Sequence, residues 1–126
     1  MPEEYESLVA ELQALTQTED PEANPPVTVT LPMAEDEWYT RPDTVSYGTV
    51  SLDFEADALR GDNGKVATAY EGRVDLYSLV KGGAGWIPLI TAALEKWCDG
   101  AWQLNSRQYE NETSLYHWEW TFQVEG

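Results

Sequence analysis

The chain has 126 residues, of which 42% are hydrophobic and 12% aromatic; this suits one packed domain and is too apolar for a disordered chain. Its 23 acidic residues against seven Lys and Arg give a net charge of −16, so nucleic acids and anionic membranes should repel it. One cysteine excludes an intramolecular disulfide, and no apolar run approaches the roughly 20 residues of a membrane span. We expect a soluble protein made in a reducing cytoplasm.

The N-terminal third is predicted to hold one helix, an acidic connector and one strand. Apolar residues at helical spacing predict an amphipathic helix over residues 3–16. Residues 18–26 form a Pro-rich acidic connector, and alternation in 27–31 predicts a strand at a sheet edge. Residues 32–43 have no period and are expected to be a surface loop.

The middle of the chain predicts a long hairpin followed by a second helix. Residues 45–54 and 66–80 alternate between apolar and polar side chains, and the loop between them, 55–65, contains an Asp-Asn-Gly turn signal. Residues 86–98 carry an apolar stripe at helical spacing, and Gly100 follows at the position favoured just past a helix end.

The last two extended segments, 101–109 and 115–124, predict a second hairpin. Tyr116, Trp118, Trp120 and Phe122 share one face of the final strand, which is typical of a strand that packs in a core. Matching of the faces favours a loop of odd length, with Trp102 opposite Trp120, unless a bulge intervenes. The fold class is therefore α+β: an antiparallel sheet of four to five strands with two helices on one face, in the order α-β-β-β-α-β-β.

No catalytic or metal-binding constellation stands out. His117 lies on the polar face of its strand and has no second His or Cys at ligand spacing, so the pattern favours an exposed or rim histidine. A nucleophilic pair of Cys98 with His117 has nothing to place the two side by side. The alternating acids Asp53, Glu55 and Asp57 lack the glycine and distal glutamate of a calcium loop. We expect no enzyme, cofactor or metal.

Residues 66–124 carry short strings that resemble those of a known family. The segments "YEGRVDLYS", "WIPLITAALEKW" and "SLYHWEWTFQV" resemble the tail completion, or tail terminator, proteins of long-tailed bacteriophages, which join the tail to the head. The resemblance covers about the last 80 residues and, more loosely, the first 16. Residues 18–44 depart from the family pattern and look like an acidic, Pro-rich insertion in a single domain spanning 1–126.

The resemblance implies a structural role without catalysis. Members of this family form a ring, typically a hexamer, that caps the tail tube and docks on the head connector, and DNA passes through without specific binding. The expected location is the virion tail or neck, after assembly in the host cytoplasm. An acidic subunit suits a channel that DNA must cross without sticking.

The loops at 33–44 and 55–65 are the candidate contacts with other subunits or with the tail tube, because they hold aromatic and charged residues that the core does not need. The candidate interface residues are Trp38, Tyr39, Arg41, Asp57, Arg60, Asp62 and Lys65. Trp86 is a further aromatic residue without an assured place in the core.

Two other functions stay open. An acidic chain is also typical of a DNA-mimic inhibitor of a host DNA-binding protein, which would be a compact monomer or dimer. A carbohydrate-binding module would need the aromatic row of the last strand to lie outside the core.

Overall fold

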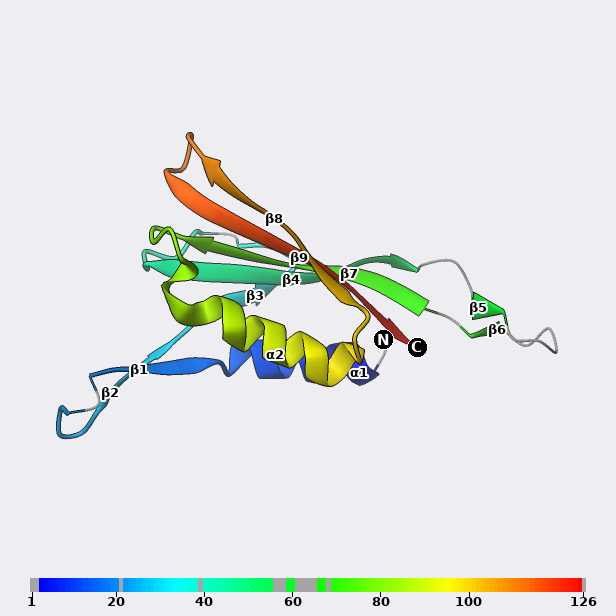
Figure 1. Ribbon diagram of the computed structural model, residues 1–126, viewed down its shortest axis with the longest axis horizontal. Coiled ribbons are helices and arrows are strands. Elements are labelled where there is room, and N and C mark those ends of the chain that lie inside the picture. Colours follow the sequence, from blue (N-terminus) through cyan, green and yellow to red (C-terminus); the bar gives the residue numbers. More distant parts are fainter. Residues whose placement is uncertain are drawn as a thin grey trace.

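The computed structural model describes residues 3–20, 22–38, 40–55, 59–60, 66–67 and 69–125, and it has an α+β fold. Five strands form the main sheet in the order β3-β4-β7-β9-β8, and two helices cover one of its faces (Figure 1). The helices are α1 (Glu3–Gln13) and α2 (Trp86–Cys98). The strands of this sheet are β3 (Met33–Glu35), β4 (Ser46–Glu55), β7 (Ala69–Ser78), β8 (Trp102–Glu110) and β9 (Leu115–Glu125). The predicted fold class is confirmed.

Both helices bury the stripe that the sequence indicates. In α1 the buried side chains are Tyr5, Leu8, Val9 and Leu12, and the helix ends three residues before the predicted boundary because Thr16 already begins a strand. Helix α2 spans the predicted residues, and its chain reverses through Asp99 and Gly100, both at positive φ. Trp86, which the sequence left without an assured place, is buried in the core.

The sheet is not antiparallel throughout. Strand β3 pairs in parallel with β4, inside the segment 32–43 that was predicted to be a loop, so that prediction is wrong here. Gly48 of β4 permits the close approach of this edge: a Cβ atom there would lie 2.8 Å from Cε of Met33 and 2.7 Å from the carbonyl oxygen of Asp75. A three-residue strand carries too few residues for a period to be visible in the sequence.

Two further pairs of strands lie outside the main sheet. The predicted edge strand at 27–31 is instead β2 (Val27–Thr30), which pairs with β1 (Thr16–Asp20) in a hairpin that projects from the body (Figure 1). Within the predicted 55–65 loop, the structure describes a short strand, β5 (Leu59–Arg60). It pairs with β6 (Val66–Ala67), which follows the loop. Part of the predicted acidic insertion at 18–44 therefore lies in the β1–β2 hairpin, whose register is irregular between Thr18 and Asp20.

The β8–β9 hairpin has a different register from the predicted one. Four residues, 111–114, connect the strands, and an irregularity between Leu104 and Ser106 restores the matching of the faces. Trp102 consequently lies opposite Phe122 rather than Trp120, which lies opposite Leu104. The even loop and the bulge compensate each other, as the parity argument allows.

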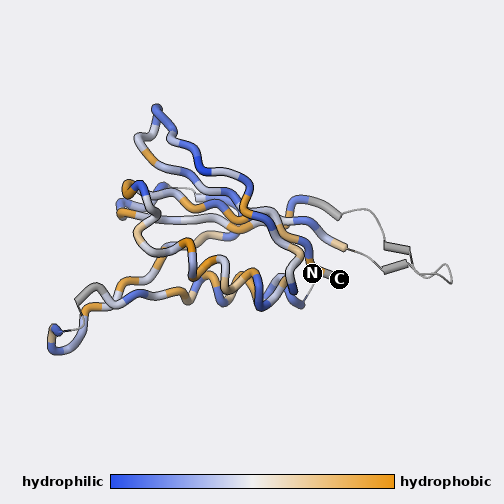
Figure 2. The backbone as a smooth tube through the Cα atoms, viewed as in Figure 1, coloured by the Kyte–Doolittle hydropathy of each residue, from blue (hydrophilic) through white to orange (hydrophobic). Residues whose placement is uncertain are grey.

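The core lies between the helices and the sheet. Trp118, Trp120, Phe122 and Val124 of β9 are all buried on the helix-covered face, which confirms that the final strand belongs to the core and excludes it as an exposed sugar platform. Strand β8, by contrast, is mostly hydrophilic along the outer edge of the sheet (Figure 2). The opposite face of the sheet, here called the open face, carries the polar side chains.

Candidate functional site on the open sheet face

The strand register places the side chains of the open face in rows that cross β4, β7 and β9. One row contains Tyr47, Tyr77 and His117. The next row contains Thr49, Asp75 and Glu119, followed by Ser51, Arg73 and Thr121. Because opposed side chains on adjacent strands lie about 5 Å apart at Cβ, each row is a set of direct neighbours.

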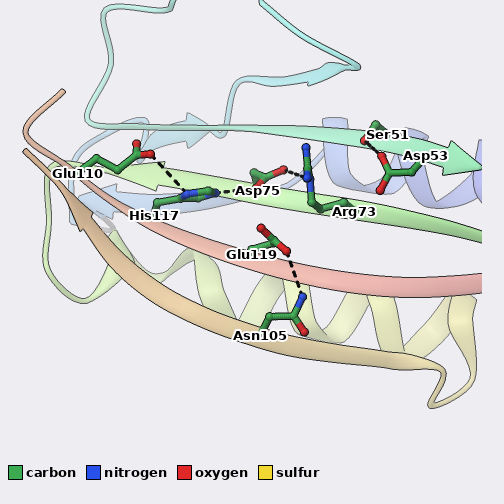
Figure 3. Close-up of polar contacts among 8 residues, drawn as sticks. All are labelled: Ser51, Asp53, Arg73, Asp75, Asn105, Glu110, His117 and Glu119. Atoms are coloured by element: carbon green, nitrogen blue, oxygen red, sulfur yellow. Dashed lines mark hydrogen bonds and ion pairs between the residues drawn. The ribbon is translucent and has the colours of Figure 1, made fainter. Parts of the chain in front are cut away.

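Asp75 is the centre of the polar contacts, although it is only 4% exposed. Its Oδ1 lies 2.6 Å from Nε2 of His117, and its Oδ2 accepts a hydrogen bond of 3.0 Å from Nε of Arg73 (Figure 3). The carboxylate in turn raises the pKa of the Arg73 guanidinium above its ordinary value. A buried carboxylate needs such partners, since burying it alone would be costly.

His117 has a carboxylate near each of its two ring nitrogens. Its side chain is 16% exposed, and its second ring nitrogen, Nδ1, lies 3.8 Å from a carboxylate oxygen of Glu110 (Figure 3). The ring also stacks on Tyr77, with centroids 4.4 Å apart. The sequence predicted a histidine without a chemical partner. That prediction is wrong, because His117 contacts Asp75.

Glu119 completes the cluster. One of its carboxylate oxygens accepts a hydrogen bond from the Asn105 side chain, 3.2 Å long, at the edge strand β8 (Figure 3). Potential ligand atoms of Asp75, His117 and Glu119 all lie within 4.8 Å of one another. Sequence reasoning missed this cluster because β7 and β9 are separated in the chain by α2 and were not predicted to pair.

A stack of three rings runs beside the cluster. Tyr47 stacks on Tyr77 at 5.1 Å, and Tyr77 stacks on His117. Burial, with the charges of Asp75 and Glu110 added, raises the pKa of Tyr77 to about 12. Both tyrosines thus stay neutral hydroxyls at ordinary pH, and burial likewise raises the pKa of Tyr47.

Two of the predicted interface residues reach this face. Trp38 donates a hydrogen bond of 3.0 Å from Nε1 to the carbonyl oxygen of Gly48 and packs edge-on against Tyr47. The Arg41 guanidinium lies 6.0 Å from the centre of the Tyr47 ring. Both line a cavity of about 300 Å³ that Arg73 and Asp75 also line. The structure therefore brings Trp38 and Arg41 together next to Asp75.

The other predicted interface residues are not brought to this site. Tyr39, Asp57, Asp62 and Lys65 lie outside the described residues. For Arg60 the backbone is described, in β5, but the side chain is not.

Cys98 is on the other side of the sheet from His117. It is buried in the core at the end of α2, and burial, aided by the charge of Glu95, raises the pKa of its thiol to about 12. A thiol that is neutral and covered is a poor nucleophile. The two residues therefore cannot act as a catalytic pair.

A second surface lies at the end of the molecule where the β1–β2 hairpin begins. A cavity of about 550 Å³ is bordered there by Val29, Val45, Val80 and Trp86, among others. Val45 and Val80 are exposed, as is the neighbouring Leu79. We call the three exposed side chains of Val45, Leu79 and Val80 the apolar patch.

Comparisons with known proteins do not add a family. No protein-family model matches the chain, and a search of curated proteins finds no similar sequence. Neither helix in the described part of the chain has the length and apolar character needed to cross a bilayer.

Proposed function

We propose that this protein is a non-enzymatic phage virion subunit, a tail terminator that forms a ring, caps the tail tube and joins it to the head connector. The observation that carries the proposal is the apolar patch beside the projecting β1–β2 hairpin. Contiguous exposed apolar side chains on a soluble protein mark surfaces that another molecule covers.

A ring needs two different surfaces on each subunit, because a head-to-tail interface joins unlike patches. The apolar patch supplies one. The open face supplies a second, on which Trp38 and Arg41 stand at the rim of a polar cavity. Aromatic and arginine side chains are the types enriched in protein interfaces.

The charge of the chain supports the same role. With a net charge of −16, subunits around a channel would repel the phosphates of DNA and let it slide. The expected site of action is the tail or neck of the virion, with the tail tube protein and the head connector as neighbours.

Particle size tests the ring directly. Mass photometry and negative-stain images of the purified protein, alone and with tail tube protein, should show rings, with a hexamer expected. A double substitution, Val45→Asp with Val80→Asp, should abolish ring formation, whereas Leu104→Asp on the exposed edge strand β8 is the matched control and should leave it intact.

The capping function needs its own assay. Tail tubes polymerising from purified tube protein should stop growing when the protein is added, and a Trp38→Ala, Arg41→Ala variant should cap less well if the open face meets the tube. A monomer that leaves tube growth unchanged but binds a basic host protein tightly would instead identify a DNA mimic.

A further inference from the structure

We propose that Asp75, His117 and Glu119 form a binding site for one divalent transition-metal ion of the zinc type. One imidazole nitrogen and two carboxylates are a donor set that such ions accept. The site does not depend on ring formation, because all three residues lie on one face of one chain.

Strand geometry brings the three donors together. His117 and Glu119 are two residues apart on β9 and therefore point to the same face. Asp75 on β7 lies directly opposite Glu119. Since both strands lie inside the sheet, with β4 and β8 beyond them, the backbone that carries the donors is held by hydrogen bonds on both sides.

Asp75 and Glu119 are each oriented by a partner that leaves another atom facing the cluster. Arg73 holds Oδ2 of Asp75, so that Oδ1 faces His117. Glu110 lies near Nδ1 of His117, and Asn105 binds one oxygen of Glu119 (Figure 3). Metal-binding histidines usually donate their other N–H to a carboxylate, and ligating carboxylates are hydrogen-bonded in the same way.

The local charge favours a cation. With a neutral imidazole, the carboxylates of Asp75, Glu110 and Glu119 leave two negative charges after Arg73 is counted. Among the described residues, no Lys or Arg forms an ion pair with Glu119 or Glu110. Asp75, the most buried of these carboxylates, gains more from a bound ion than an exposed carboxylate does.

Ion binding requires a defined rearrangement. Two ligands of a tetrahedral zinc ion lie about 3.3 Å apart, whereas Nε2 of His117 and Oδ1 of Asp75 are separated by 2.6 Å. A carboxylate only accepts, so Nε2 carries the proton in this contact. When the ion takes Nε2, the single proton of the neutral ring is transferred through solvent from Nε2 to Nδ1, where it faces Glu110, and Glu119 moves inward. Water, or a group from a neighbour, fills the remaining position.

The single histidine of the chain makes the test direct. Protein stripped with a chelator is titrated with zinc by calorimetry, and ¹⁵N-labelled protein is followed by long-range ¹H–¹⁵N NMR of the imidazole. We expect one equivalent to bind and the Nε2 resonance to change from a protonated to a metal-bound nitrogen. His117→Gln and Glu119→Gln should each weaken binding at least tenfold, with circular dichroism to check folding.

Three controls separate this site from other sources of binding. Glu112→Gln changes an exposed carboxylate of the β8–β9 loop and should leave affinity unchanged. Cys98→Ser removes the only thiol and should also have no effect. Calcium should not displace zinc at equal concentration. Unchanged affinity in both Gln variants, an Nε2 resonance that stays protonated at saturation, or equal binding of calcium would each overturn the proposal.

Discussion

At the scale of single residues, Asp75 decides how the open face is held. Its carboxylate accepts charge-assisted hydrogen bonds from Arg73 and His117 while almost fully buried. Replacing it by the isosteric amide in Asp75→Asn keeps the volume and removes the charge that both partners need. We expect a loss of about 2–4 kcal/mol in the free energy of unfolding, measured in urea with a chelator present.

A nearby carboxylate provides the matched control. Asp53 on the same face is exposed and accepts a hydrogen bond from Ser51, 3.1 Å long, which is its one hydrogen bond to a described side chain. Asp53→Asn should therefore change the free energy of unfolding by no more than about 0.5 kcal/mol. Equal losses of unfolding free energy in the two variants would mean that the buried contacts of Asp75 do not stabilise the fold more than an exposed carboxylate does.

Tyr77 makes a prediction about alkaline pH. Its pKa rises from the ordinary 10.0 to about 12 because burial disfavours the phenolate. A raised pKa in the folded state means that its contribution is complete below pH 10 and is lost as the pH rises from 10 to 12. A Tyr77→Phe variant should lose less stability over this interval than the parent, as followed by urea denaturation. Tyr109→Phe, at an exposed tyrosine, should behave like the parent.

At the scale of elements, β9 is the strand on which the core depends most. Trp118 is buried between the sheet and the helices. Truncation in Trp118→Ala should lower the free energy of unfolding by about 3–5 kcal/mol, since a cavity of indole size cannot collapse. Leu104→Ala, at a side chain 41% exposed on the paired strand, should cost less than about 1 kcal/mol. A neutral Trp118→Ala would contradict the core assignment.

The elements that the sequence predicts correctly are long enough for the apolar and polar pattern of their side chains to repeat several times. Helix α2 and the strands β4, β7 and β9 run for ten residues or more, so their apolar alternation or stripe is unmistakable. Strand β3 has three residues, and β1 is polar throughout, so neither shows a pattern. The predicted register of β8 and β9 is wrong because the bulge near Asn105 has no sequence signal of its own.

The candidate site was predictable only in part. Parity correctly assigned His117 to the polar face of its strand, and Asp75 and Glu119 lie on that same face of the sheet. What could not be derived is which strands are neighbours, because the pairing of β7 with β9 spans a whole helix. The sequence shows no partner for a lone histidine, because the carboxylate that contacts it lies 42 residues away in the chain.

At the scale of the whole molecule, charge repulsion opposes both folding and assembly. Arg73 and Lys96 each form an ion pair with a carboxylate, which offsets little of a net charge of −16. Raising the NaCl concentration from about 0.01 to 0.3 M shortens the screening length several-fold. The melting temperature should therefore rise by a few degrees, as measured by calorimetry. A fall on adding salt would show that attractive pairs outweigh the repulsion.

The same salt series bears on the ring. If like-charged subunits meet around a channel, the ring fraction seen by mass photometry should increase with salt over this range. An interface held by opposite charges would show the reverse, and an apolar interface centred on Val45 and Val80 predicts the increase.

The position of β9 inside the sheet has a consequence for synthesis on the ribosome. Helix α1 packs on α2 and β9, and β9 lies between β7 and β8, so the apolar stripe of residues 5–12 finds no complete binding surface until residue 125 has left the exit tunnel. Contacts so distant in sequence close slowly. Until then the nascent chain carries an amphipathic helix whose apolar face is not fully covered.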